Sequence, residues 1–455
     1  MSMEHERRRI GRRTFLWGAA ASAGAVAIGG ALAGIPGAIA GKPGGTATRN
    51  PLYIPPTVTP SSYTLTAAPA TVSLGGGKLS SVWAYNGLLP GPTLLASRGD
   101  TATITLSNRL SQPTITHWHG MIVDDLNDGA PRLAIPSLAT YNYNFPINQR
   151  SAMNWYHPHP HMLTGEQVAM GLAGAFIVRD AEEAGLGLPS GVYEVPLVVR
   201  DATFDKSGNM AYTPRNGGFL GNTPLVNGTL NAGLNVDAAR YRFRILGGAN
   251  ARIFGLALSN GAPFTLIGND GGLLENSISV NQIDLSPGER VDVILDFRGL
   301  VVGSKVMLRD LRSGWDLLEF AVTRAGSDTG ITPGSLSSIT RLSNPVVTRN
   351  FSFDGMSRIN GKTYEVDRID FTVPFGQTEL WRFSTAGNAP HPVHVHGASF
   401  QVVSRTGGRG RLFPWEAGWK DTVLLEDGET VEILIRFDAF RGLYVIHCHK
   451  LEHED

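Results

Sequence analysis

The chain has little cysteine and no excess of charge of either sign. One cysteine occurs in 455 residues, so an intrachain disulfide is excluded. Lysine plus arginine equals aspartate plus glutamate, with 39 of each, and the formal net charge at pH 7 is zero. Outside the N-terminal segment there is no run of basic residues that would attract nucleic acid or an anionic membrane. We therefore expect neither as a partner.

Long apolar runs and long runs of helix-forming residues are also scarce. Glycine (55) and proline (27) are plentiful instead, and short segments alternate apolar and polar residues, as in "SYTLTAAPATVSL" at 62–74. This pattern favours antiparallel β-structure, and a parallel-sheet fold is not expected because strands and helices do not alternate. A chain of this length needs roughly two to four domains.

The N-terminal segment resembles a twin-arginine export signal. The stretch "RRRIGRRTFLW" contains the arginine pair Arg12 and Arg13, and an Ala/Gly-rich segment follows and ends near 38–40. We predict a signal peptide at 1–40 and a periplasmic, cell-wall or secreted protein without membrane insertion after its removal. The alternative is an uncleaved anchor, since the segment is about long enough to span a bilayer.

Three blocks of the chain repeat a polar turn followed by an alternating strand. The echoes are "GDTATITLSN" at 99–108, "GLNVDAARYRFRILGG" at 233–248 and "GQTELWRFST" at 376–385. Gly-, Ser- and Pro-rich linkers separate the blocks near 179–191 and 324–338. The sequence therefore predicts an all-β fold of three consecutive β-sandwich domains. The expected domains span 50–180, 190–325 and 345–455.

Histidine is concentrated in four short motifs. Of the twelve histidines, His5 lies in the predicted signal, and the other eleven form four tight groups. The groups are "THWHG" (His117, His119), "WYHPHPH" (His157, His159, His161), "HPVHVHG" (His391, His394, His396) and "HCHKLEH" (His447, His449, His453). Residues i and i+2 of a strand point to the same face, so each H-x-H pair presents two imidazoles together. Four such pairs can surround a cluster of metal ions, although imidazole alone does not choose among copper, zinc and iron.

The cysteine selects copper. In "HCH", Cys448 faces the side of the strand opposite to His447 and His449. A thiolate with two imidazoles in a trigonal arrangement is the blue-copper electron-transfer site, and His391 and His453 can supply the imidazoles. One strand would then hold copper on one face and a second metal site on the other, with a short covalent path between them.

At these four motifs the sequence resembles the multicopper oxidases, a family that includes laccases, bilirubin oxidases and bacterial copper-efflux oxidases. The resemblance covers about residues 50–455, and "HPHPHMLTGEQVAMGLAGAFIV" at 157–178 is most similar to the copper-efflux branch. It implies three cupredoxin-like Greek-key domains and four copper ions: one type 1, one type 2 and a type 3 pair. The type 1 site would lie in the third domain, and the trinuclear cluster between the first and third.

The resemblance also implies which residues bind each copper. His391, Cys448 and His453 would be the type 1 ligands, and His117 and His394 would hold the type 2 copper. The type 3 ligands would be His119, His157, His159, His396, His447 and His449. The remaining His161 would lie behind the ligands or face the surface.

Two carboxylates match family residues that serve proton delivery. Asp128, in "DDLNDGAP", corresponds to an acid near the type 2 copper, and Glu454 follows His453 directly. The alternative for each is a solvated loop carboxylate.

We expect one-electron oxidation of phenols, aromatic amines or bilirubin-like pigments, coupled to four-electron reduction of dioxygen to water. We expect the protein to be a monomer.

Two rival functions stay open. The first is a cuprous oxidase for copper tolerance, but the methionine-rich insert typical of copper-efflux oxidases is missing, and 351–375 holds only Met356. A cupredoxin scaffold or copper-binding protein without turnover is the other. Family members carry an axial methionine ten residues after the cysteine, whereas this sequence ends seven residues after it. We interpret the sequence as incomplete; the alternative is a type 1 site without the axial sulfur.

Overall fold

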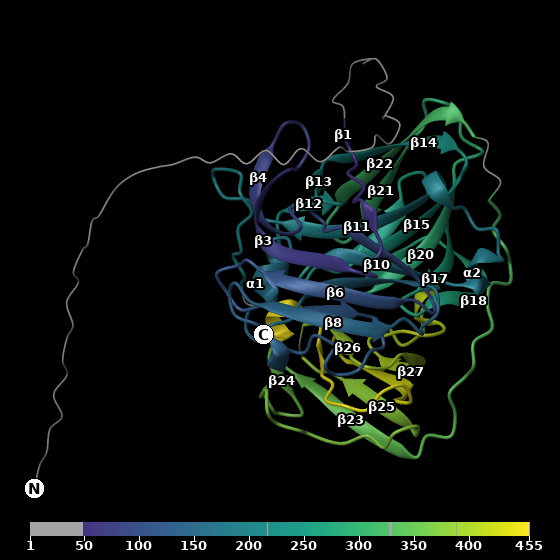
Figure 1. Cartoon of the computed structure of the whole chain (residues 1–455). Coiled ribbons are helices and arrows are strands. Elements are labelled where there is room, and N and C mark those ends of the chain that lie inside the picture. Colours follow the sequence, from purple (N-terminus) through teal and green to yellow (C-terminus); the bar gives the residue numbers. More distant parts are fainter. Residues whose placement is uncertain (1–48, 216, 327–329, 388, 455) are drawn as a thin grey trace, which may run out of the picture. The chain divides into compact units, whose positions relative to one another are not determined.

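The computed structural model describes residues 49–454 except 216, 327–329 and 388 (Figure 1). The predicted signal at 1–40 lies outside the described residues. Strand makes up 48% of the structure and helix 6%, which confirms the all-β prediction. The α-helices are short: α1 (Thr164–Ala169), α2 (Ala181–Ala184) and α3 (Leu451–Glu454).

The first sandwich consists of a four-stranded sheet, β4-β3-β6-β8, and a five-stranded sheet, β2-β5-β10-β9-β7. In β6 the residues Ala102, Ile104 and Leu106 alternate with more exposed ones and enter a shared apolar core. The strand bounds are β2 (Thr57–Val58), β3 (Tyr63–Ser73), β4 (Leu79–Tyr85), β5 (Thr93–Ser97), β6 (Thr101–Asn108), β7 (Thr116–His119), β8 (Thr140–Pro146), β9 (Ala152–Pro158) and β10 (Gly174–Arg179).

The second sandwich consists of a seven-stranded sheet, β13-β12-β11-β15-β20-β17-β18, and a six-stranded sheet, β1-β14-β22-β21-β16-β19. Strand β1 thus pairs with a sheet far from it in sequence. The bounds are β1 (Asn50–Pro51), β11 (Glu194–Ala202), β12 (Thr223–Val226), β13 (Thr229–Leu230), β14 (Ala232–Ala238), β15 (Arg240–Gly247), β16 (Phe254–Leu258), β17 (Phe264–Asn269), β18 (Gly272–Val280), β19 (Ile283–Leu285), β20 (Arg290–Asp296), β21 (Lys305–Asp310) and β22 (Trp315–Ala325).

The third sandwich consists of a five-stranded sheet, β24-β23-β25-β29-β27, and a three-stranded sheet, β28-β26-β30. Its core includes Phe383, Val393, Ile433 and the single cysteine, Cys448. The bounds are β23 (Val347–Asp354), β24 (Arg358–Ile359), β25 (Thr378–Ser384), β26 (His391–Val395), β27 (Phe400–Gly407), β28 (Thr422–Leu425), β29 (Glu429–Arg436) and β30 (Ile446–Cys448).

The sheets are mixed rather than purely antiparallel, which corrects the expectation from composition. Each sandwich contains a parallel pair: β3 with β6, β11 with β15, and β23 with β25. The paired strands are separated in sequence by other strands or turns, so no βαβ unit is needed, in agreement with the sequence prediction. The boundaries 50–180, 190–325 and 345–455 stay a prediction. None of the helices described is long and apolar enough to cross a membrane.

An ionic cluster joins the end of the first sandwich to the second. Glu183 in α2 accepts hydrogen bonds from Arg242 at 3.1 Å and Arg244 at 2.8 Å, both on β15. Burial raises the pKa of Glu183, but Coulomb attraction to Arg244 and Arg242 outweighs it, and the pKa lies well below its ordinary value of 4.5. The carboxylate is therefore ionised, and it shares the two buried guanidinium groups with Asp292 and Glu194.

Replacement of Glu183 tests this junction. Because Glu183→Gln leaves buried guanidinium groups short of an anion, we expect a loss of about 3 kcal/mol in unfolding free energy at pH 7, measured by urea unfolding. A depressed carboxylate pKa contributes stability above pH 4.5 that is lost as the pH falls toward the folded-state pKa. The difference between wild type and variant should therefore shrink on acidification, and a constant difference from pH 7 to pH 3 would contradict the account.

Candidate metal centre

Strand register brings the histidine motifs into facing pairs. In the first sandwich β7 pairs with β9, which sets His117 opposite His157. In the third, β26 pairs with β30, which sets His394 opposite His447. The second histidine of each H-x-H pair (His119, His159, His396 and His449) lies at or just past the strand end and keeps the same face.

Eight imidazoles from these two sheets converge, as the sequence predicted. Their ring nitrogens approach across the junction of the first and third sandwiches, and all eight residues are buried. The contacts are His117 Nε2–His394 Nε2 at 3.4 Å, His119 Nδ1–His449 Nε2 at 3.1 Å, His157 Nε2–His449 Nε2 at 3.4 Å, His159 Nε2–His447 Nε2 at 3.3 Å and His396 Nε2–His447 Nε2 at 3.0 Å. We call this the eight-histidine cluster.

The donor geometry fits metal ions. An ion bonded to two imidazole nitrogens at about 2.0 Å and a tetrahedral angle holds those nitrogens about 3.3 Å apart, close to the spacing found here. Burial lowers the pKa of His157 to about 3 and that of His447 to about 4, so both rings are neutral at pH 7. Neutral nitrogens that face one another with their lone pairs are the ligands that a cation requires.

A second site lies on the other face of β30. The Cys448 sulfur is 3.3 Å from His391 Nδ1 and 3.8 Å from His453 Nδ1, and these two nitrogens are 3.4 Å apart. A trigonal ion with nitrogen bonds of about 2.0 Å and a sulfur bond of about 2.3 Å gives sulfur–nitrogen distances of about 3.7 Å. Burial raises the pKa of the Cys448 thiol to about 12, so a thiolate here needs a bound cation.

The two sites are neighbours along one strand. His447 and His449 belong to the eight-histidine cluster, while Cys448 between them belongs to the cysteine–histidine site. The expected alternation of faces is therefore present, and three consecutive residues connect the two sites through covalent bonds.

The structure also places both predicted carboxylates at the cluster. Asp128 is fully buried, its Oδ2 lies 2.8 Å from His396 Nδ1, and its main-chain oxygen lies 2.6 Å from His117 Nδ1. Burial raises the pKa of Asp128 well above its ordinary value. Glu454 has a carboxylate that is 5% exposed and lies 3.2 Å from His159 Nδ1. The alternative of solvated loop carboxylates is wrong for both residues.

Sequence reasoning missed an aspartate beside His119 and the arginine that pairs with it. Asp421, which precedes β28, lies 3.0 Å from His119 Nε2, and Arg290 of β20 forms an ion pair with it. Neither residue stands in a histidine motif, and no spacing in the sequence connects them. In contrast, His161 is exposed and contacts the ring of Tyr364, in agreement with the surface position considered for it.

Comparison with known proteins identifies the family. Three models described as multicopper oxidase match residues 66–183, 179–303 and 332–455 in turn. The chain belongs to the multicopper oxidase family. It is 35% identical to a multicopper oxidase of Staphylococcus haemolyticus, over 87% of this chain and 86% of that protein. It is 32% identical to a laccase of Bacillus subtilis, over 82% of this chain and 88% of the laccase.

A solved multicopper oxidase has the same fold. The McoA crystal structure from Aquifex aeolicus superposes with a TM-score of 0.83 at 33% identity, over 90% of this chain and 97% of that one. The three sandwiches are therefore cupredoxin-like domains, which confirms the predicted fold class. Multicopper oxidases bind four copper ions and are copper-dependent oxidoreductases that use oxygen, and the clusters described above are consistent with this.

Replacement of the cysteine should separate the two sites of this multicopper oxidase. Because Cys448→Ser removes the thiolate without touching the eight-histidine cluster, we expect loss of the blue absorption band and of about one copper ion per chain. Metal analysis and absorption spectroscopy measure both. His161→Ala, which removes an exposed histidine, is the control and should keep colour and copper. Loss of all copper from Cys448→Ser would contradict two separate sites.

Proposed function

We propose that this multicopper oxidase is a laccase-type enzyme that oxidises phenols, aromatic amines or bilirubin-like pigments by single electrons. The observation that supports this most directly is the complete donor set: eight converging imidazoles and a cysteine–histidine site joined by His447, Cys448 and His449. A scaffold protein without turnover has no need to keep all eleven side chains buried and convergent.

We assign the copper ligands from their contacts. His391, Cys448 and His453 form the type 1 site, and the pair His117 and His394 forms the type 2 site. The type 3 sites follow from the remaining approaches, with His119, His157 and His449 around one ion and His159, His396 and His447 around the other. When bound, the four ions would supply the four electrons that convert dioxygen to two waters.

The protein's part in this chemistry is to collect electrons, connect the sites and deliver protons. Cys448 would hold the copper that accepts electrons from the substrate, and its peptide neighbours His447 and His449 are two imidazoles of the cluster. Asp128 and Glu454 would hold protons at carboxylate oxygens that lie beside His396 and His159. Buried acids at these distances can pass protons without opening the cluster to bulk water.

A cavity of about 520 Å³ reaches the type 1 site and favours aromatic substrates. Its lining includes the rings of Phe351, Phe353, Tyr364 and Phe371 as well as His391. Such a volume lies within the range of small-molecule sites. Aromatic walls favour planar organic reductants over bare ions.

Cuprous oxidation is the second candidate, because Met162 and Met356 also line this cavity and both are exposed. Thioether sulfur is a ligand that Cu(I) prefers. The two functions differ in which substrate has the higher kcat/KM.

Export through the predicted signal at 1–40 and a monomeric state stay predictions, which cell fractionation and sedimentation equilibrium would test.

The substrate class is tested by comparing oxygen consumption with a methoxyphenol and with Cu(I). We expect the higher kcat/KM for the phenol, because aromatic side chains outnumber thioethers around the cavity. Met356→Leu keeps the volume of the side chain and removes the sulfur, so it should leave phenol oxidation unchanged. Faster Cu(I) oxidation that falls in Met356→Leu would support the cuprous oxidase instead. Four bound coppers without any turnover would support the scaffold protein.

The proton-delivery role predicts a defect that spares metal binding. Because Asp128→Asn keeps the size of the side chain but removes its acid function, we expect turnover to fall on the order of 10²-fold with the copper content intact. Glu454→Gln should act in the same direction. The measurements are oxygen consumption and metal analysis on the same samples. A loss of copper in proportion to the loss of activity would contradict a role in proton transfer.

A further inference from the structure

His119 is oriented differently from the other imidazoles of the eight-histidine cluster. It faces His449 through Nδ1, whereas the other contacts among the eight join one Nε2 to another. Its Nε2 points away, to Asp421 Oδ1 and to Thr422 Oγ1, each at 3.0 Å, and the Thr422 hydroxyl itself donates to Asp421 Oδ1 at 2.9 Å. An imidazole that offers the Nδ1 lone pair to an ion must carry its proton on Nε2, and a carboxylate acceptor there fixes that tautomer.

Asp421 is in turn held from the second sandwich. Arg290 donates to Asp421 Oδ1 at 2.7 Å and to Oδ2 at 2.5 Å, and the two side chains are 1% and 5% exposed. Two parallel bonds fix the plane of the carboxylate as well as its position. Oδ1 is thereby aimed at His119.

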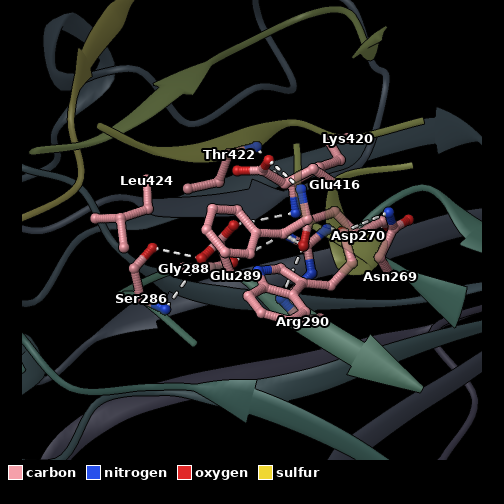
Figure 2. Close-up of polar contacts among 12 residues, drawn as sticks. Asn269, Asp270, Ser286, Gly288, Glu289, Arg290, Glu416, Lys420, Thr422 and Leu424 are labelled. Atoms are coloured by element: carbon pink, nitrogen blue, oxygen red, sulfur yellow. Dashed lines mark hydrogen bonds and ion pairs between the residues drawn. The ribbon is translucent and has the colours of Figure 1, made fainter. Parts of the chain in front are cut away.

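The guanidinium uses every one of its donors. Its remaining donors reach three main-chain oxygens: Nε bonds Met153 at 2.9 Å, Nη1 bonds Gly288 at 2.9 Å and Nη2 bonds Asp270 at 3.2 Å. All five N–H groups of Arg290 therefore have acceptors. The partners come from all three sandwiches: Met153 from β9, Gly288 and Asp270 beside β20, and Asp421 from the segment before β28. Figure 2 shows Arg290 among the polar residues of this junction.

Two glycines allow this close approach. A Cβ on Gly120, directly after His119, would lie 2.5 Å from Arg290 Nη2. A Cβ on Gly288 would lie 3.0 Å from His119 Cε1, and both glycines have positive φ. The second sandwich therefore packs its backbone directly against a cluster imidazole.

A purely structural role for the Arg290–Asp421 pair, in which it only holds the sandwiches together, does not explain the bond from Asp421 to His119. Lys420 already joins the second and third sandwiches through Asp270 at 3.0 Å and Glu289 at 3.1 Å. Arg242 and Asp292 form a similarly buried bidentate pair within the second sandwich, but neither contacts a cluster histidine. The Arg290–Asp421 pair differs from both in its bond to His119.

We propose that Arg290 and Asp421 are positioning residues that hold His119 with Nδ1 toward the trinuclear centre. The second sandwich, which supplies none of the eleven predicted ligands, thereby controls the geometry of one type 3 site. This inference rests on the proposed assignment of His119 as a copper ligand.

The experiment compares Asp421→Ala, Arg290→Gln and Arg290→Lys with wild type in the full copper-loaded chain. Removal of a carboxylate partner of a metal-bound histidine weakens metal affinity about 10- to 100-fold. We expect copper titration to show a loss of that size for part of the cluster copper. Electron paramagnetic resonance should show a changed trinuclear signal, while the blue band of Cys448 is unchanged. Arg290→Lys keeps the charge but not the two parallel bonds, so its defect should be intermediate.

Arg242→Gln is the matched control, because it breaks an equally buried arginine–carboxylate pair in the same sandwich. It should lower the unfolding temperature without altering copper affinity or the trinuclear signal. Wild-type copper affinity and signal in both Asp421→Ala and Arg290→Gln would overturn the proposal, as would equal losses at the blue site and the cluster. If Arg290→Gln does not fold, Asp421→Ala and Arg290→Lys decide the question. A wild-type chain without cluster copper would instead refute the proposed function.

Discussion

The metal centre depends on burying neutral imidazoles with their lone pairs facing one another. Burial lowers the pKa values of these rings, so their facing nitrogens carry lone pairs rather than an additional proton. Such an arrangement is unfavourable by itself and becomes favourable when cations occupy the centre. The two sheets that carry β7, β9, β26 and β30 therefore form a site whose stability is coupled to copper.

A single strand, β30, carries residues of both metal sites. The period of two in β30 sends Cys448 to one face and His447 to the other, so the backbone between them is the shortest possible link. The cysteine is buried at the edge of the apolar core of the third sandwich, and the cavity described above reaches it from the other side. Both core packing and the link between the two sites therefore require Cys448 to be buried on this face of β30.

The second sandwich takes part in the centre without supplying a predicted ligand. Its Arg290 and Gly288 lie against the carboxylate and the ring that define the His119 position. Buried charges are costly unless every donor and acceptor is matched, and here each guanidinium N–H has an acceptor.

The sequence by itself determined the β-class, the three-block organisation and the pairing of histidines on one strand face, because period-two alternation fixes which side chains share a face. The family resemblance implied that these pairs converge. Cys448 between two histidines was enough to indicate copper. The parallel strand pairs, the burial of Asp128 and the contacts of Arg290 and Asp421 with His119 were decided only by tertiary structure. The physical reason is that these features join segments distant in sequence: Asp421 is 131 positions from Arg290 and 302 from His119, and no local pattern of hydrophobicity or spacing records which distant groups will meet.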